Sequence, residues 1–177
     1  MACPKFPAPP AIRACEAKRK PARCEIQRGA ALRPPGRTRL ELQLRRETPS
    51  VEAYNSLRRS VGWQPIAPLV AEASLAGSLY CVTLWDGAEL VGMARVVGDG
   101  ALYFHLHDVL VASERQGRGL GDRLVRAALA YFEETAGPGA MLGLMSAGGK
   151  DGFYERYGFI RRPNETMGSG MVLYRAG

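Results

Sequence analysis

Residues 109–121 have the sequence VLVASERQGRGLG, in which an apolar run leads into a glycine-rich turn. Beyond the turn, apolar residues recur at helical spacing and charged residues occupy the other side, so an amphipathic helix is expected from Gly119 to the break at Gly137. The apolar positions of this helix are Leu120, Leu124, Val125, Ala128, Tyr131 and Phe132. Glycine lets the backbone approach a ligand closely, and the first N–H groups of a helix have no partner within it. Such a turn can bind a diphosphate.

Two common nucleotide-binding patterns do not fit this turn. A Walker loop needs Lys-Ser or Lys-Thr after its last glycine, whereas Asp122 and Arg123 follow Gly121. The dinucleotide fingerprint Gly-x-Gly-x-x-Gly fails because Asp122 occupies the sixth position counted from Gly117. Nucleoside triphosphates and NAD are therefore disfavoured. The pattern that remains is Gln116-x-x-Gly119-x-Gly121.

This pattern resembles motif A of the GNAT family of N-acetyltransferases, which binds the diphosphate of acetyl-CoA. Residues 152–159, Gly-Phe-Tyr-Glu-Arg-Tyr-Gly-Phe, resemble motif B of the same family, and the two motifs stand in the family's order. The resemblance extends over residues 38–175 and is strongest over 101–162. It implies a mixed α/β fold with a central twisted, mostly antiparallel sheet flanked by helices. It also implies an enzyme that moves the acetyl group of acetyl-CoA to a primary amine of a small molecule or a protein.

The same resemblance implies which residues would serve acetyl transfer. Contacts to acetyl-CoA are expected from the end of the strand and from the turn, at Val109, Leu110, Val111, Gln116, Gly117, Arg118, Gly119, Leu120 and Gly121. Tyr154 is the candidate general acid, because a phenol with a pKa near ~10 is protonated at neutral pH and can give its proton to the departing thiolate. The alternative is that Tyr154 only packs, with its hydroxyl bonded to the backbone. Tyr157 is interpreted as a core residue.

The general base is less sharply indicated. His105 and His107 are two apart on an expected strand and so share a face, while Asp108 points to the other face unless a bulge intervenes. His107 and Asp108 are the candidate bases, and Asp108 could instead bind a cationic substrate. A structural role is the alternative for each histidine. The carboxylates of Glu72 and Glu89 stay open as further candidates.

Two classes of function therefore remain. The first is the acetyltransferase, and the second is a module that binds acyl-CoA and regulates without turnover. Tyr54 and Trp63 lie where the family's substrate-side elements fall and suggest an aromatic-lined acceptor pocket. No metal is expected, because Cys3, Cys15, Cys24 and Cys81 lack the paired spacing of a zinc site. Cys81 is expected to be a small core residue of a strand.

Charge divides the chain into a basic tail, residues 1–37, and a near-neutral part, residues 38–177, which the resemblance implies is the N-acetyltransferase domain. The tail carries nine Lys or Arg against two Glu and seven of the twelve prolines, whereas the rest of the chain has equal numbers of acidic and basic residues. Such a composition predicts disorder. The tail could contact nucleic acid through its charge, although a segment without a role is the favoured reading. With no signal peptide and no long apolar run, the chain is expected to be cytoplasmic and to have no membrane partner. A homodimer is a possible further partner.

Periodicity and turn residues locate the remaining elements of residues 38–177. Ser50 can cap a helix through Tyr54 and Leu57, and Pro68 can begin another that ends at Ala76. Strands are expected over 38–44, 79–85, 89–97, 101–111 and 141–145, around Phe159 and over 171–174. A short helix is expected at Phe153 and Tyr154.

Overall fold

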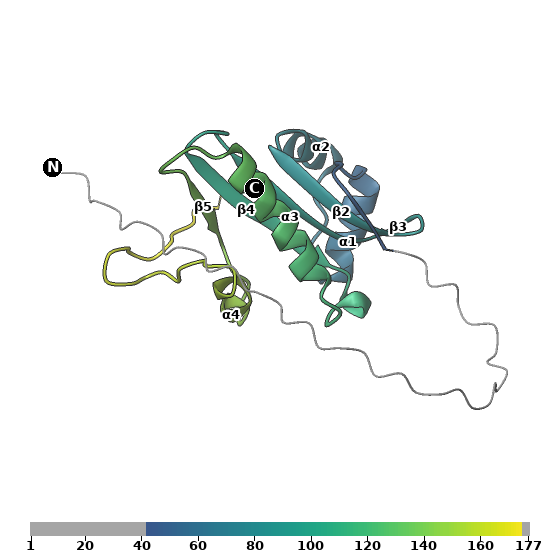
Figure 1. The fold of residues 1–177 in the computed structure, drawn as a ribbon. Coiled ribbons are helices and arrows are strands. Elements are labelled where there is room, and N and C mark those ends of the chain that lie inside the picture. Colours follow the sequence, from purple (N-terminus) through teal and green to yellow (C-terminus); the bar gives the residue numbers. More distant parts are fainter. Residues whose placement is uncertain (1–41, 175–177) are drawn as a thin grey trace, which may run out of the picture. The chain divides into compact units, whose positions relative to one another are not determined.

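The computed structural model describes residues 42–174 and contains one mixed sheet flanked by helices (Figure 1). Its five strands lie in chain order: β1 (Gln43–Arg45), β2 (Tyr80–Asp86), β3 (Glu89–Gly98), β4 (Tyr103–Val111) and β5 (Met141–Leu144). The first three pairings are antiparallel and β4 pairs with β5 in parallel. The predicted fold class is confirmed. The expectation for residues 1–37 lies outside the described residues.

The helices begin where local sequence signals place them. Ser50 caps α1 (Val51–Ser60), with the Ala53 N–H donating to its Oγ at 3.2 Å. Proline opens α2 (Pro68–Ala76), where the missing N–H has no cost. Gly119 precedes α3 (Leu120–Thr135), and α4 (Asp151–Glu155) is a single short turn of helix. These four predictions are confirmed.

One layer of the core fills the space between the sheet and α3, which crosses one face of the sheet (Figure 1), and a second layer includes buried residues of α1 and α2. Leu84, Leu124 and Val125 are completely buried there, whereas Met93 is completely buried on the opposite face of the sheet, which it shares with Arg95. Gly92 on β3 makes this packing possible, because a Cβ at that position would lie 3.2 Å from both the Leu110 carbonyl oxygen and Leu124 Cδ1. Aromatic pairs between sheet and helix extend the core, with ring centroids 4.6 Å apart for Tyr80–Tyr131 and 5.2 Å for Phe104–Phe132. As expected, Cys81 is a buried residue of β2.

Alternation along β4 assigns its two faces. Phe104 points to α3, so His105 and His107 point to the opposite face, where α1 and α2 pack. The β3–β4 pairing then shifts register between Met93 and Arg95, and Asp108 has a φ of +48°. A bulge therefore does intervene, and it turns Asp108 to the same face as Arg95, with which its carboxylate pairs.

Two expected strands are not formed, one around Phe159 and one over residues 171–174. Neither segment pairs with a strand of the sheet, and between them the Asn164 side-chain oxygen accepts from the Thr166 and Met167 N–H groups at 3.0 and 2.9 Å. Such local bonds compete with the ladder that a strand needs. The first strand is also shorter and later than expected, since it covers Gln43–Arg45, and residues 38–41 lie outside the described range. No helix between residues 42 and 174 has the length and apolarity needed to cross a bilayer.

Candidate functional site

The glycine-rich turn joins β4 to α3 and presents backbone donors. Gly117 and Gly119 have φ values of +73° and +76°, a region that favours glycine, and a Cβ at either position would meet no atom within 4 Å. Gln116 fastens the turn to the strand by donating from Nε2 to the Val111 carbonyl at 3.0 Å. In the described part of the chain, the N–H groups of Leu120 and Gly121 have no acceptor. An open helix N-terminus of this kind suits an anion.

Helix α4 packs against the first turn of α3. A Cβ on Gly121 would lie 3.3 Å from Cζ of Phe153, so only a residue as small as glycine fits there without displacing the ring. The Tyr157 hydroxyl donates to Oδ1 of Asp122 at 2.6 Å. Burial, followed by this bond, raises the pKa of Tyr157 to about 12. Tyr157 is therefore more than the core residue expected, because it links the two helices.

The packing of α4 also holds Tyr154. Its ring is half-buried between Phe153 and Phe159, with centroids 5.0 and 6.0 Å away. Burial raises the pKa of the Tyr154 phenol, which keeps the group protonated. Within residues 42–174 its hydroxyl makes no hydrogen bond, so the backbone bond of the structural alternative is not present there.

The two histidines lie together on β4, on the face opposite α3. Their ring centroids are 4.4 Å apart. His105 packs on β5, where a Cβ at Gly143 would lie 3.3 Å from its Cδ2, and among the described residues its buried Nδ1 has no partner. His107 is exposed. Burial lowers the pKa of both imidazoles, and the charge of Asp108 opposes that effect at His107.

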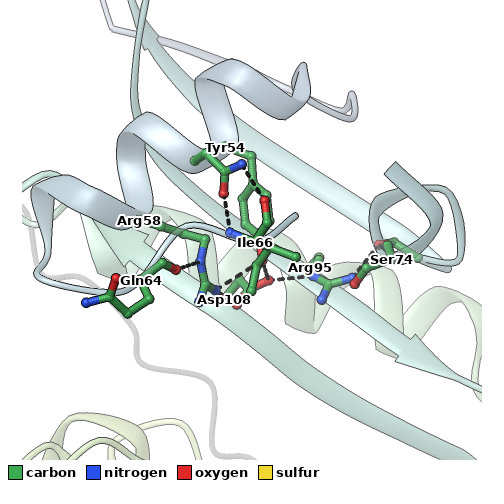
Figure 2. A network of polar contacts seen from close by, with 9 residues as sticks. Tyr54, Arg58, Gln64, Ile66, Ser74, Arg95 and Asp108 are labelled. Carbon is green, nitrogen blue, oxygen red and sulfur yellow. Dashed lines mark hydrogen bonds and ion pairs between the residues drawn. The ribbon is translucent and has the colours of Figure 1, made fainter. Parts of the chain in front are cut away.

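Asp108 is held in a polar network between β3, β4 and α1 (Figure 2). Its Oδ2 accepts from Nε of Arg95 at 2.6 Å and from the Tyr54 hydroxyl at 2.9 Å. Nη1 of Arg95 in turn donates to the Ser74 carbonyl at 2.7 Å. The Asp108 side chain is only 8% exposed. Its charge is thus already paired, which disfavours Asp108 both as a base and as the ligand of a cationic substrate.

Arg58 forms the outer part of this network. Its Nε donates to the Gln64 carbonyl at 2.9 Å, and its Nη1 lies 3.9 Å from Oδ1 of Asp108. The guanidinium carbon lies over two rings, 5.4 Å from the centroid of Tyr54 and 5.0 Å from that of Trp63. Tyr54 is buried and Trp63 is 43% exposed. The structure therefore brings the two predicted aromatics together around an arginine.

Sequence reasoning missed Arg58 and Arg95. Arg95 did carry a signal, because it is the single charge within the apolar run 90–97, and a charge in a buried strand requires a partner. Arg58 carried none, since an arginine in the last turn of a helix is ordinary. The two carboxylates that the sequence left as further candidate bases lie away from the histidines: Glu72 is exposed on α2, and Glu89 is 3.9 Å from Nη2 of Arg115. Neither forms a polar contact with the histidines in the described range.

Comparisons with known proteins identify the family and the fold. Residues 62–175 match the model of the acetyltransferase (GNAT) domain. A probable acetyltransferase from meticillin-resistant Staphylococcus aureus is 29% identical, with a TM-score of 0.70 over 76% of this chain and 100% of that one. A GNAT-family acetyltransferase from Streptococcus pneumoniae is 25% identical, with a TM-score of 0.62 over 77% and 100%. A third, from Brucella melitensis in complex with acetyl-CoA, is 21% identical, with a TM-score of 0.53 over 77% and 97%, and shares the fold. No curated protein matches the sequence.

Proposed function

Because the chain belongs to the GNAT family of acetyltransferases, we propose that it transfers the acetyl group of acetyl-CoA to a primary amine, with Tyr154 as general acid. One observation carries the proposal. The helix that bears the unbonded Tyr154 hydroxyl is packed, through Phe153 on Gly121, against the same turn whose backbone donors are open. An anion site and a proton donor are thus fixed relative to each other.

The turn suits the diphosphate of the cosubstrate. Gly117, Arg118 and Gly119 are exposed, two of them have the positive φ that brings backbone toward a ligand, and Leu120 and Gly121 offer N–H donors. Val109, Leu110 and Val111 end the adjacent strand and are the backbone proposed to contact the pantetheine arm. Acetyl-CoA supplies an acetyl group activated as a thioester.

The side chains of the site then divide the proton transfers. We assign the base to His107, because it reaches solvent on β4 and partial desolvation of its imidazole holds its pKa below the usual value, so the imidazole is neutral near pH 7 and can accept the ammonium proton. Tyr154 gives its proton to the departing sulfur. Asp108, paired with Arg95, serves as a positioning residue, because it holds the bulge that directly follows His107.

The test is acetyl transfer to a panel of amines. The full chain is incubated with acetyl-CoA and small-molecule amines, amino acids or lysine-containing peptides, and released thiol is followed while mass spectrometry identifies the acetylated product. We expect thiol release that depends on the amine, with an N-acetyl product. Tight binding of acetyl-CoA without transfer to any amine would instead favour the regulatory module.

A further inference from the structure

The network around Asp108 has an excess of positive charge. Arg58 and Arg95 both face this single carboxylate, at 3.9 and 2.6 Å, so two cations share one anion. Desolvation lowers the pKa of both histidines on the same face, which favours their neutral form and adds no positive charge to this balance near pH 7. A cationic group that approached this network would meet a net charge of like sign, whereas an anionic group would be attracted.

Each arginine also keeps a donor free. Arg58 uses Nε for the Gln64 carbonyl and Nη1 for the Tyr54 hydroxyl, and Arg95 uses Nε for Asp108 and Nη1 for the Ser74 carbonyl. Among the described residues Nη2 of neither arginine has an acceptor, and Arg58 is half-buried whereas Arg95 is buried. Guanidinium N–H groups of this kind bind carboxylates strongly.

Arg58 is held in place before any ligand arrives. Its guanidinium lies between the rings of Tyr54 and Trp63, and the loop that carries Trp63 and Gln64 is fixed by Asn55. The buried Asn55 side chain donates to the Ile66 carbonyl at 2.9 Å and accepts from the Ile66 N–H at 2.8 Å. A side chain already ordered loses little freedom on binding, which favours affinity.

The position of Arg95 connects this anion site to the reaction. Arg95 and His107 are directly opposite each other in the β3–β4 pairing, so their side chains are neighbours on one face. Resting on the proposed function, we infer that the acceptor is a small amine that also carries a carboxylate. Arg58 and Arg95 bind the carboxylate, the amine faces His107, and the exposed ring of Trp63 contacts the rest of the molecule.

The experiment compares amino acids with their own amides as acceptors. Methionine, phenylalanine and glutamine are each paired with the corresponding amide, which keeps the amine and side chain and removes only the negative charge. The amide has the more acidic ammonium and hence more neutral amine at pH 7.5, so intrinsic reactivity favours the amide. We expect kcat/KM with acetyl-CoA to favour the acid by about 10- to 100-fold.

Variants of α1 assign this preference to Arg58. In Arg58→Gln the ratio of kcat/KM for the acid to kcat/KM for the amide should fall toward one. In Arg58→Lys, which keeps the charge without the planar fork, the ratio should lie between that of Arg58→Gln and that of the unmodified protein. Arg59→Gln is the matched control, because Arg59 is the exposed neighbour on the same helix and its loss removes the same charge. Its ratio should equal that of the unmodified protein. Circular dichroism and the melting temperature verify that each variant is folded.

The outcomes separate this inference from the proposed function. Amides, or the polyamine spermidine, acetylated as well as the acids would overturn the inference and leave the acetyltransferase intact. If no amine is acetylated, the inference is tested by binding instead: calorimetry compares the affinities of N-acetylmethionine and of its amide, with coenzyme A present. A preference for the acid that Arg58→Gln abolishes would support the carboxylate site while the proposed catalysis fails, and equal binding would overturn both.

Discussion

At the scale of single residues, one backbone angle decides which side chains meet. A φ of +48° at Asp108 costs about 1–2 kcal/mol for a residue other than glycine. The ion pair with Arg95 and the bond from Tyr54 offset that cost. Conversely, Arg95 could not be buried in β3 without a partner, because an unpaired buried charge destabilises a protein by about 3–5 kcal/mol. The bulge and the ion pair therefore depend on each other.

Tyr154→Phe tests the general acid, because it keeps the ring and removes the proton. We expect kcat to fall by about 10²–10⁴-fold with little change in acetyl-CoA affinity. Since burial raises the pKa of Tyr154, the alkaline limb of kcat in the unmodified protein should lie above ~10. A tyrosine that only packs would show near-normal kcat and a loss of about 0.5–1.5 kcal/mol in unfolding free energy. Steady-state kinetics, calorimetry and thermal unfolding on one variant distinguish the two.

His107→Gln tests the base through the pH dependence of kcat/KM. The imidazole must be neutral to accept a proton, and burial lowers its pKa, so activity of the unmodified protein should rise with pH through an apparent pKa below ~6.5. That acid limb should disappear in His107→Gln, while His105→Gln, altered on the same face of β4, should keep it. Loss of the limb only in the His105 variant would transfer the role to His105.

At the scale of elements, a short helix acquires its position from a longer one. Helix α4 has too few residues to be stable alone, and it is held by Phe153 on Gly121 and by Tyr157 on Asp122. The same first turn of α3 offers its N–H donors to an anion. The two proposed roles, anion binding and proton donation, are thus linked through one turn of α3, although motif A and motif B are apart in the sequence.

Gly119→Glu and Gly119→Gln together test the anion site of this turn. Both variants carry the same strain, because Gly119 has a φ of +76°, and both should lose about 1–2 kcal/mol of stability. Only the glutamate adds a negative charge at the diphosphate. We expect the glutamate variant to lose acetyl-CoA binding in calorimetry and the glutamine variant to retain more of it. Equal, unchanged affinities would remove the assignment of the turn to the cosubstrate.

At the scale of the whole molecule, composition divides the chain more sharply than any motif. The formal net charge of +7 belongs entirely to residues 1–37, and these residues carry few of the apolar side chains that could add to a core. The domain core lies within residues 42–174, where the sheet and α3 bury their own apolar faces.

Deletion of residues 1–37 tests this division. We expect the melting temperature and the rate of acetyl transfer to small amines to be nearly unchanged, because a charged, proline-rich segment buries little apolar area. Binding of nucleic acid, measured at two salt concentrations, would show whether the charge of the tail has a use. A drop of many degrees in melting temperature would mean that the segment packs on the domain.

Local chemistry was enough to predict most elements from the chain alone. Ser50, Pro68 and Gly119 mark helix starts, and the residues at 86–87 and 98–100 mark tight turns, because caps and turns act between residues a few positions apart. The same is true of the glycine turn and of Tyr154, which lie within short motifs. Residues 159–174 had strand-like apolar pairs, but a strand also needs a partner edge, and in the described residues neither segment pairs with the sheet.

The tertiary structure alone decided how the polar network around Asp108 is assembled. Tyr54 and Asp108 are 54 positions apart, and the bulge that brings them together follows from the need to pair Arg95 inside a sheet. Arg58 joins them because α1 packs over β3 and β4. The energy of a buried charge depends on everything within a few ångströms and on no fixed sequence spacing. For that reason the sequence indicated the turn proposed to bind the cosubstrate, whereas the network of Arg58, Arg95 and Asp108 could be found only in the folded chain.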